Sequence, residues 1–128
     1  MLRLAVFTLV LGGLGASPGL AQTAASVQAG HAVFEDQCAG CHSNQAGVDR
    51  FGPTLAGIYG RTSGTAPLHV YSPAMKSAHV VWDAKNLNGF LENPRRFMPG
   101  TIMPYSGLAS GRARADVIAY LKSISRSS

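Results

Sequence analysis

The chain has 128 residues, of which 46% are hydrophobic and 13% are charged, and this composition suits one globular domain. The net charge is +5 and the isoelectric point is near 9.7, but no basic run interleaved with aromatic residues occurs, which argues against nucleic-acid binding. Only two cysteines are present, so a small scaffold held by several disulfides is excluded.

The first 21 residues have the pattern of a secretory signal peptide. Arg3 supplies a positive start, residues 4–14 form a short apolar stretch, and Pro18 precedes the small residues Gly19 and Ala21. The apolar stretch is too short to span a bilayer comfortably, which counts against the alternative of a retained membrane anchor. We therefore expect residues 1–21 to be cleaved and residues 22–128 to form one exported domain without stable membrane insertion.

Three helices are expected in the remaining chain. Residues 27–41 place apolar and small side chains on one face at spacings of three and four. Residues 84–92 follow Asp83, a good N-cap, and end before Pro94. Residues 112–125 carry a second apolar stripe opposite polar side chains. The sequence therefore predicts an all-α fold.

The segment between His42 and Trp82 is rich in glycine and proline and shows no persistent strand pattern. A body of three helices and long loops is a poor hydrophobic core for a domain of this size. A large, flat, apolar cofactor at the centre would complete that core.

Residues 38–42 read CAGCH and contain both cysteines. A bridge between Cys38 and Cys41 would close a loop too short to stabilise much, and a thioredoxin-like redox motif needs a neighbouring βαβ pattern that is missing. Zinc would need two further soft ligands at matching spacing, which the other histidines do not provide. C-x-x-C-H is the attachment signature of c-type haem, in which the thiols bond the porphyrin and His42 reaches the iron.

The segment RRFMPGTIMPYSG offers a second ligand for the iron. Met103 stands between Pro99 and Pro104, and a proline-stiffened loop holds a weak thioether ligand in place. Met98 faces a different way in such a loop and is expected to pack, and Met75 is expected to cover the cofactor or the loop above it.

Four motifs together resemble the small soluble class I cytochromes c: G-x-x-x-F-x-x-x-CAGCH, GPTLAGIYGR, NPRRFMPGTIM and RADVIAYLK. They occur in the family's order and spacing, from about Val27 to Ser125. The resemblance implies a single-domain cytochrome c fold, with three or more helices and long loops wrapped around one covalently bound haem c.

The resemblance also assigns roles to individual residues. Cys38 and Cys41 would carry the thioether bonds, and His42 and Met103 would be the axial ligands of the iron. The carbonyl of Pro53 would accept the second N–H of His42. The haem propionates would be neutralised or hydrogen-bonded by Arg61, Tyr71, Trp82 and Thr101. The family's crossing of the terminal helices would involve Gly30, Phe34, Val117 and Tyr120, and the pocket lining would include Leu55, Leu91 and Leu121.

The function implied by the resemblance is one-electron transport in the periplasm, without catalysis. The expected partners are redox proteins, such as a membrane oxidoreductase, a terminal oxidase, a reaction centre or a periplasmic dehydrogenase, and the protein is expected to be a monomer. The alternative is a haem enzyme or gas sensor with an open sixth position, in which Met103 would only pack. A thiol–disulfide oxidoreductase that uses Cys38 and Cys41 is a third possibility, which haem attachment would exclude.

The chain departs from the family pattern in two ways. Phe90 stands where many relatives have a tyrosine that hydrogen-bonds near the methionine sulfur. Mitochondrial relatives also surround the haem edge with lysines, whereas these positions here include Gln37, Ile102, Ala109 and Ser110, and basic character remains at Arg50, Arg95 and Arg96. We therefore expect a mixed contact with redox partners, apolar at its centre and with a few arginines at its rim.

Overall fold

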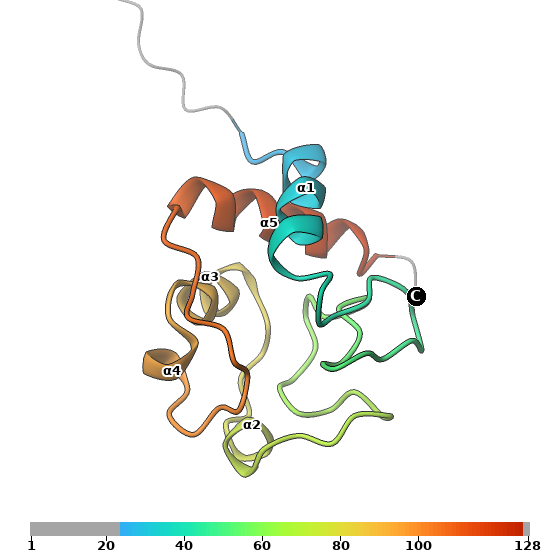
Figure 1. The fold of residues 1–128 in the computed structure, drawn as a ribbon, viewed down its shortest axis with the longest axis vertical. Coiled ribbons are helices and arrows are strands. Elements are labelled where there is room, and N and C mark those ends of the chain that lie inside the picture. Colours follow the sequence, from blue (N-terminus) through green and yellow to red (C-terminus); the bar gives the residue numbers. More distant parts are fainter. Residues whose placement is uncertain (1–23, 127–128) are drawn as a thin grey trace, which may run out of the picture.

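A computed structural model describes residues 24–126, so the expected signal peptide lies outside the described residues. Five helices occur in this part of the chain, and long loops join them (Figure 1). They are α1 (Val27–Gln37), α2 (Pro73–Ser77), α3 (Ala84–Glu92), α4 (Pro94–Phe97) and α5 (Gly111–Ser123). Within residues 24–126 no strand forms and one isolated bridge joins Thr62 to Val81, so the predicted all-α fold is confirmed.

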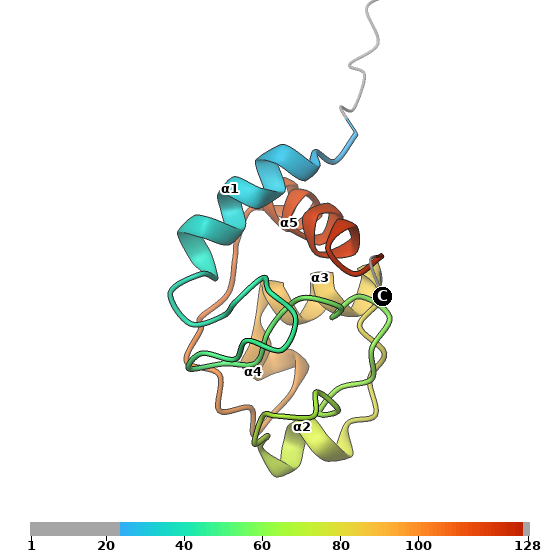
Figure 2. The same cartoon turned by 90° about the vertical axis from the view of Figure 1, so that its right-hand side faces the viewer.

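The two terminal helices α1 and α5 cross at one end of the molecule, and α2 lies at the other end (Figures 1 and 2). Each of the two begins at a serine N-cap: Ser26 accepts the Ala29 N–H, and Ser110 accepts the Ala113 N–H. At Gly30 the two helices lie so close together that an added Cβ would overlap the Asp116 carbonyl oxygen. The lack of a side chain at Gly30 therefore allows the two backbones to touch.

The second helix pair, α3 and α4, is set by two caps. Asp83 accepts the Asn86 N–H and begins α3. Asn93 ends α3 and also begins α4, because its side chain accepts the Arg96 N–H at 3.0 Å while Pro94 occupies the first turn. The predicted bounds of α3 are confirmed.

Three details differ from the expected elements. The first helix ends at Gln37, because the chain turns at Cys38 and places the CAGCH motif on a turn after the helix. The last helix begins at Gly111 and ends at Ser123 rather than at residue 125. The short helices α2 and α4 were not predicted, since each has too few residues to show a hydrophobic period.

The hydrophobic core lies between the α1–α5 pair and α3. Its buried members include Phe34, Trp82, Leu87, Val117 and Leu121. Among the described residues no helix is both long enough and apolar enough to cross a membrane.

Candidate functional site

A cavity of about 380 Å³ lies beside this core and is lined mainly by apolar side chains. Its volume is within the usual range for cofactor and ligand sites. All nine residues that the sequence singles out as cofactor-binding lie on its wall, although they come from widely separated segments. They are Cys38, Cys41, His42, Pro53, Arg61, Tyr71, Trp82, Thr101 and Met103.

The CAGCH motif forms a compact turn at the end of α1. The N–H groups of Cys41 and His42 both donate to the Cys38 carbonyl, at 3.0 and 2.9 Å. Arg50 stabilises the turn from outside, since its Nη1 donates to the Ala39 carbonyl at 2.8 Å. One short turn thus brings two thiols and one imidazole to the same cavity.

The thiol of Cys38 is not tuned for disulfide exchange. Cys38 is partly buried, and burial raises the pKa of its thiol to about 11, while Cys41 is exposed. The thiolate is the reactive form in disulfide exchange, and catalytic C-x-x-C motifs lower the thiol pKa rather than raise it. This shift counts against a thiol–disulfide oxidoreductase.

His42 is oriented by a backbone oxygen. Its Nδ1 lies 2.7 Å from the Pro53 carbonyl, which can only accept, so Nδ1 carries the proton and Nε2 keeps its lone pair. Burial lowers the pKa of the imidazole, an effect that this hydrogen bond partly opposes. Gly52 lies against the ring, and a Cβ there would overlap His42 Cε1. A neutral, fixed imidazole is the form that binds a metal ion.

Met103 reaches the cavity from the loop between α4 and α5. Its N–H donates to Thr101 Oγ1 at 3.4 Å, and its carbonyl accepts the Tyr105 N–H at 2.9 Å. Met98, in the same loop, is only 5% exposed and packs in the core without lining the cavity. Met75 also lines the cavity. The expected division of the loop methionines, one packed and one facing the site, matches this geometry.

The polar part of the cavity wall contains an unpaired buried donor. Arg61 Nη2 donates to the Ala56 carbonyl at 2.8 Å, but its Nη1 is buried and has no hydrogen-bond partner within residues 24–126. One backbone bond joins Arg61 to Trp82, since the main-chain N–H of Trp82 donates to the Arg61 carbonyl at 2.9 Å, and both residues line the cavity. Tyr71 also lines the wall, and burial raises the pKa of its hydroxyl.

These features fit the cofactor that the motif implies. A haem has a flat apolar ring and two carboxylates, and the cavity combines apolar walls with an unsatisfied guanidinium N–H. A buried unpaired donor of this kind is costly unless an anionic group completes it.

Sequence reasoning missed several residues of the wall. His69 lies 3.7 Å from the Asp49 carboxylate, packs edge-on to Tyr71 and lines the cavity. Its only signal was a single histidine in a loop, and the path of that loop follows no period. The exposed side chains of Phe51 and Val70 were missed for the same reason.

The chain is similar to known proteins both in sequence and in fold. The cytochrome c family model matches residues 27–125. Cytochrome c of Euglena viridis is 48% identical over 95 residues, which cover 74% of this chain and 93% of that protein. Cytochrome c of Chlamydomonas reinhardtii is 45% identical over 94 residues, which cover 73% of this chain and 84% of that protein. The solved structure of cytochrome cH from Methylobacterium extorquens matches with a TM-score of 0.71 at 33% identity, over 77% of this chain and 98% of that one. The chain therefore belongs to the cytochrome c family, among its class I members.

Proposed function

We propose that this cytochrome c is a periplasmic one-electron carrier with a single haem c, attached through Cys38 and Cys41 and ligated by His42 and Met103. The family as a whole consists of haem electron carriers that exchange electrons with protein partners. The finer proposal rests mainly on the shared cavity. Both the CAGCH turn and the loop between α4 and α5 that carries Met103 (the Met103 loop) line this cavity.

The protein's own groups have distinct roles in this proposal. Cys38 and Cys41 would hold the haem through thioether bonds, and because a thiol contributes both its sulfur and its hydrogen to a vinyl group, this attachment would need no oxidant. His42 offers Nε2 to the iron because Pro53 holds the proton on Nδ1. Met103 would bind the iron through its sulfur and would thereby keep oxygen and peroxide away from it. The haem, when bound, supplies an iron that changes its charge by one electron, and His/Met ligation favours the reduced form.

Arg61, Tyr71, Trp82 and Thr101 are proposed to receive the propionates. Arg61 Nη1 is the strongest support, since it is a buried cationic donor that lacks a partner. A carboxylate beside it would satisfy the donor and share the charge of the guanidinium. This would orient the ring in the cavity and keep the carboxylates ionised.

Export to the periplasm follows from residues 1–21, which have the signal-peptide pattern described above. A periplasmic carrier would meet a membrane oxidoreductase, a terminal oxidase, a reaction centre or a soluble dehydrogenase. N-terminal sequencing of protein from the periplasmic fraction should begin at Gln22.

Acid–acetone extraction tests the attachment. The protein is expressed in the periplasm with cytochrome c maturation machinery and then extracted. Haem should stay with the protein in the aqueous layer for the wild type, and Cys41→Ala should retain at most one linkage and shift the reduced absorption bands. Haem that moves into the organic layer from the wild type would refute covalent attachment.

A further inference from the structure

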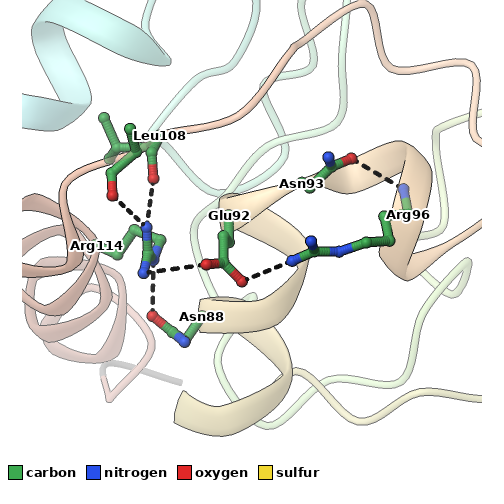
Figure 3. A network of polar contacts seen from close by, with 7 residues as sticks. Asn88, Glu92, Asn93, Arg96, Leu108 and Arg114 are labelled. Carbon is green, nitrogen blue, oxygen red and sulfur yellow. Dashed lines mark hydrogen bonds and ion pairs between the residues drawn. The ribbon is translucent and has the colours of Figure 1, made fainter.

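Arg114 is a buried arginine on α5, only 8% exposed, and it faces α3 (Figure 3). A buried guanidinium must be compensated by several acceptors, because removing its charge from water is costly. Its Nε donates to Asn88 Oδ1 of α3 at 2.8 Å, and its Nη2 lies 3.9 Å from the Glu92 carboxylate.

The third set of acceptors lies on the Met103 loop. Arg114 Nη1 donates to the carbonyls of Leu108 and Ala109, at 2.6 and 2.9 Å. The first of these bonds is drawn in Figure 3, where the guanidinium joins α5 to the end of the loop and to α3. The Arg114 side chain thus hydrogen-bonds two of the last carbonyl groups of the loop before α5.

The opposite side of the same loop end is held by α3. The Leu108 N–H donates to the Leu91 carbonyl at 2.8 Å. Gly107 has φ 116° and lies so close to Glu92 that a Cβ would overlap the Glu92 carbonyl oxygen. The peptide groups around Leu108 are therefore fixed between α3 and the Arg114 guanidinium.

We propose that Arg114 is a positioning residue for the bond between Met103 and the iron. The inference rests on the proposed function, in which Met103 is the sixth ligand. A thioether is a weak ligand, so its bond lasts only if the loop cannot swing away. In the described residues, the side-chain bonds that join loop positions 104–110 to the rest of the protein are those of Arg114, the N-cap bond from the Ala113 N–H to Ser110 Oγ, and one exposed bond between Tyr105 and Gln37. Arg114 thus lowers the rate and extent of Met103 release.

The test compares Arg114→Gln with Arg96→Gln in the holoprotein. Both arginines face the same Glu92 carboxylate, with Arg96 Nη2 at 3.0 Å, and both variants lose one positive charge. The Arg96 side chain is 70% exposed and, among the described residues, donates only to Glu92, so it is a matched control for charge. The readouts are imidazole binding to the ferric protein, which displaces the methionine, and the pH at which the red charge-transfer band disappears.

We expect imidazole to displace Met103 about tenfold more readily in Arg114→Gln, as the loss of buried charged hydrogen bonds implies, and less than about twofold more readily in Arg96→Gln. The charge-transfer band should also disappear at lower pH in the first variant only. Arg114→Lys keeps the charge but cannot reach all the acceptors, so it should fall between wild type and Arg114→Gln. If Arg114→Gln does not fold, Arg114→Lys is compared with wild type in its place.

Equal imidazole affinity in the Arg114 and Arg96 variants would overturn the proposal. A general loss of stability is separated from loop release by Ser125→Ala, which removes the acceptor of the Tyr59 N–H after the C-terminal end of α5 and does not touch the cavity wall, so it should leave imidazole affinity unchanged. Failure of the underlying function looks different, because a wild-type protein without the charge-transfer band would have no methionine ligand to release.

Discussion

At the scale of single residues, the methionines show how position decides the role of one side-chain type. Met98 is packed in the hydrophobic core, whereas Met103 lines the cavity from the loop between α4 and α5 and is followed directly by Pro104. The thioether is chemically the same in both. Only the loop geometry separates a packing residue from a candidate ligand.

Met103→Ala should remove the red charge-transfer band of the ferric protein, lower the redox potential and allow carbon monoxide to bind the ferrous iron. The reason is that, in the proposed site, the soft sulfur would favour the reduced iron and would occupy the sixth position. Absorption spectra and potentiometric titration measure all three effects. Loss of the band in Met98→Ala, with normal spectra in Met103→Ala, would contradict this ligand assignment.

Met98→Ala is expected to act on stability instead. Its side chain is buried, so truncation should lower the free energy of unfolding by about 2–5 kcal/mol while the band remains. Denaturant unfolding followed by circular dichroism measures this loss.

The residues on the cavity wall were predictable where a motif names them. The C-x-x-C-H spacing and the proline-bracketed Met103 are local patterns, and local chemistry determines them. His69 could not be found in this way, since its place on the wall and its 3.7 Å contact with Asp49 depend on how two loops meet. Phe90 is a mixed case: its helical position is predictable, but its edge-on contact with Trp82, at a ring separation of 5.0 Å, is a result of tertiary packing.

At the scale of helices, the crossing of α1 and α5 joins the two ends of the chain. Phe34 and Tyr120 pack across it with ring centroids 5.5 Å apart, next to the contact at Gly30. Because the CAGCH turn follows α1 directly, this crossing also fixes the position of the candidate attachment site.

Gly30→Ala should separate the two helices. The added Cβ would overlap the Asp116 carbonyl and lie 2.9 Å from Tyr120 Cβ, and both are parts of a packed element that cannot give way cheaply. We expect the free energy of unfolding to fall by at least about 1–3 kcal/mol. Gly40→Ala is the matched control, because nothing lies within 4 Å of its Cβ position. A similar loss in both variants would show that the close crossing is unimportant.

Asp116 adds a pH-dependent bond to the same helix pair. The Ser26 N–H donates to its carboxylate at 2.7 Å, and Arg112 Nε at 3.0 Å. The pKa of Asp116 is lowered from its ordinary value of 3.8, first by the Ser26 bond and then by Arg112. A carboxyl with a lowered folded pKa stabilises the protein above the unfolded value, and this contribution is lost as the pH falls through the folded pKa.

Asp116→Asn should therefore lower the thermal midpoint at pH 7, and its difference from wild type should shrink as the pH falls below about 4. Asp36→Asn, on the exposed face of α1, is the control and should change little. Thermal unfolding between pH 3 and pH 7 provides the comparison. A constant difference across this range would show that the charge of Asp116 has no part in joining the helices.

The bounds of some helices could be predicted from the sequence more accurately than those of others. The α3 helix has strong caps at both ends, Asp83 and Asn93, so its bounds were predicted correctly. The periodic pattern of α1 continues through Cys41, but the backbone turns at Cys38, where the N–H groups of Cys41 and His42 bond to its carbonyl. Periodicity alone cannot show where such a turn replaces the helix.

At the scale of the whole molecule, the mouth of the cavity is apolar. Phe51, Val70 and Ile102 line it and are 77%, 84% and 72% exposed. Exposed apolar side chains gathered at one site are typical of a contact surface. Two of the arginines expected at its rim already have partners within the protein: Arg50 donates to the Ala39 carbonyl, and Arg96 pairs with Glu92. Fewer positive charges therefore remain for a redox partner than the number of arginines suggests.

This surface predicts weak electrostatic steering of the redox partner. Steering scales with the charges that face the partner and is screened over about 8 Å at physiological salt. The bimolecular rate of electron transfer to a membrane redox partner should therefore fall only modestly as ionic strength rises.

Arg95→Glu should slow transfer at low salt and have little effect at high salt. Ile102→Asp should slow it at every ionic strength, because it places a charge in the apolar centre of the contact. Ser106→Asp adds the same charge at an exposed position of the same loop that does not line the cavity, and it should behave like Arg95→Glu. A steep fall of the wild-type rate with salt, together with normal transfer by Ile102→Asp, would show that charge steering governs docking and that the apolar mouth does not.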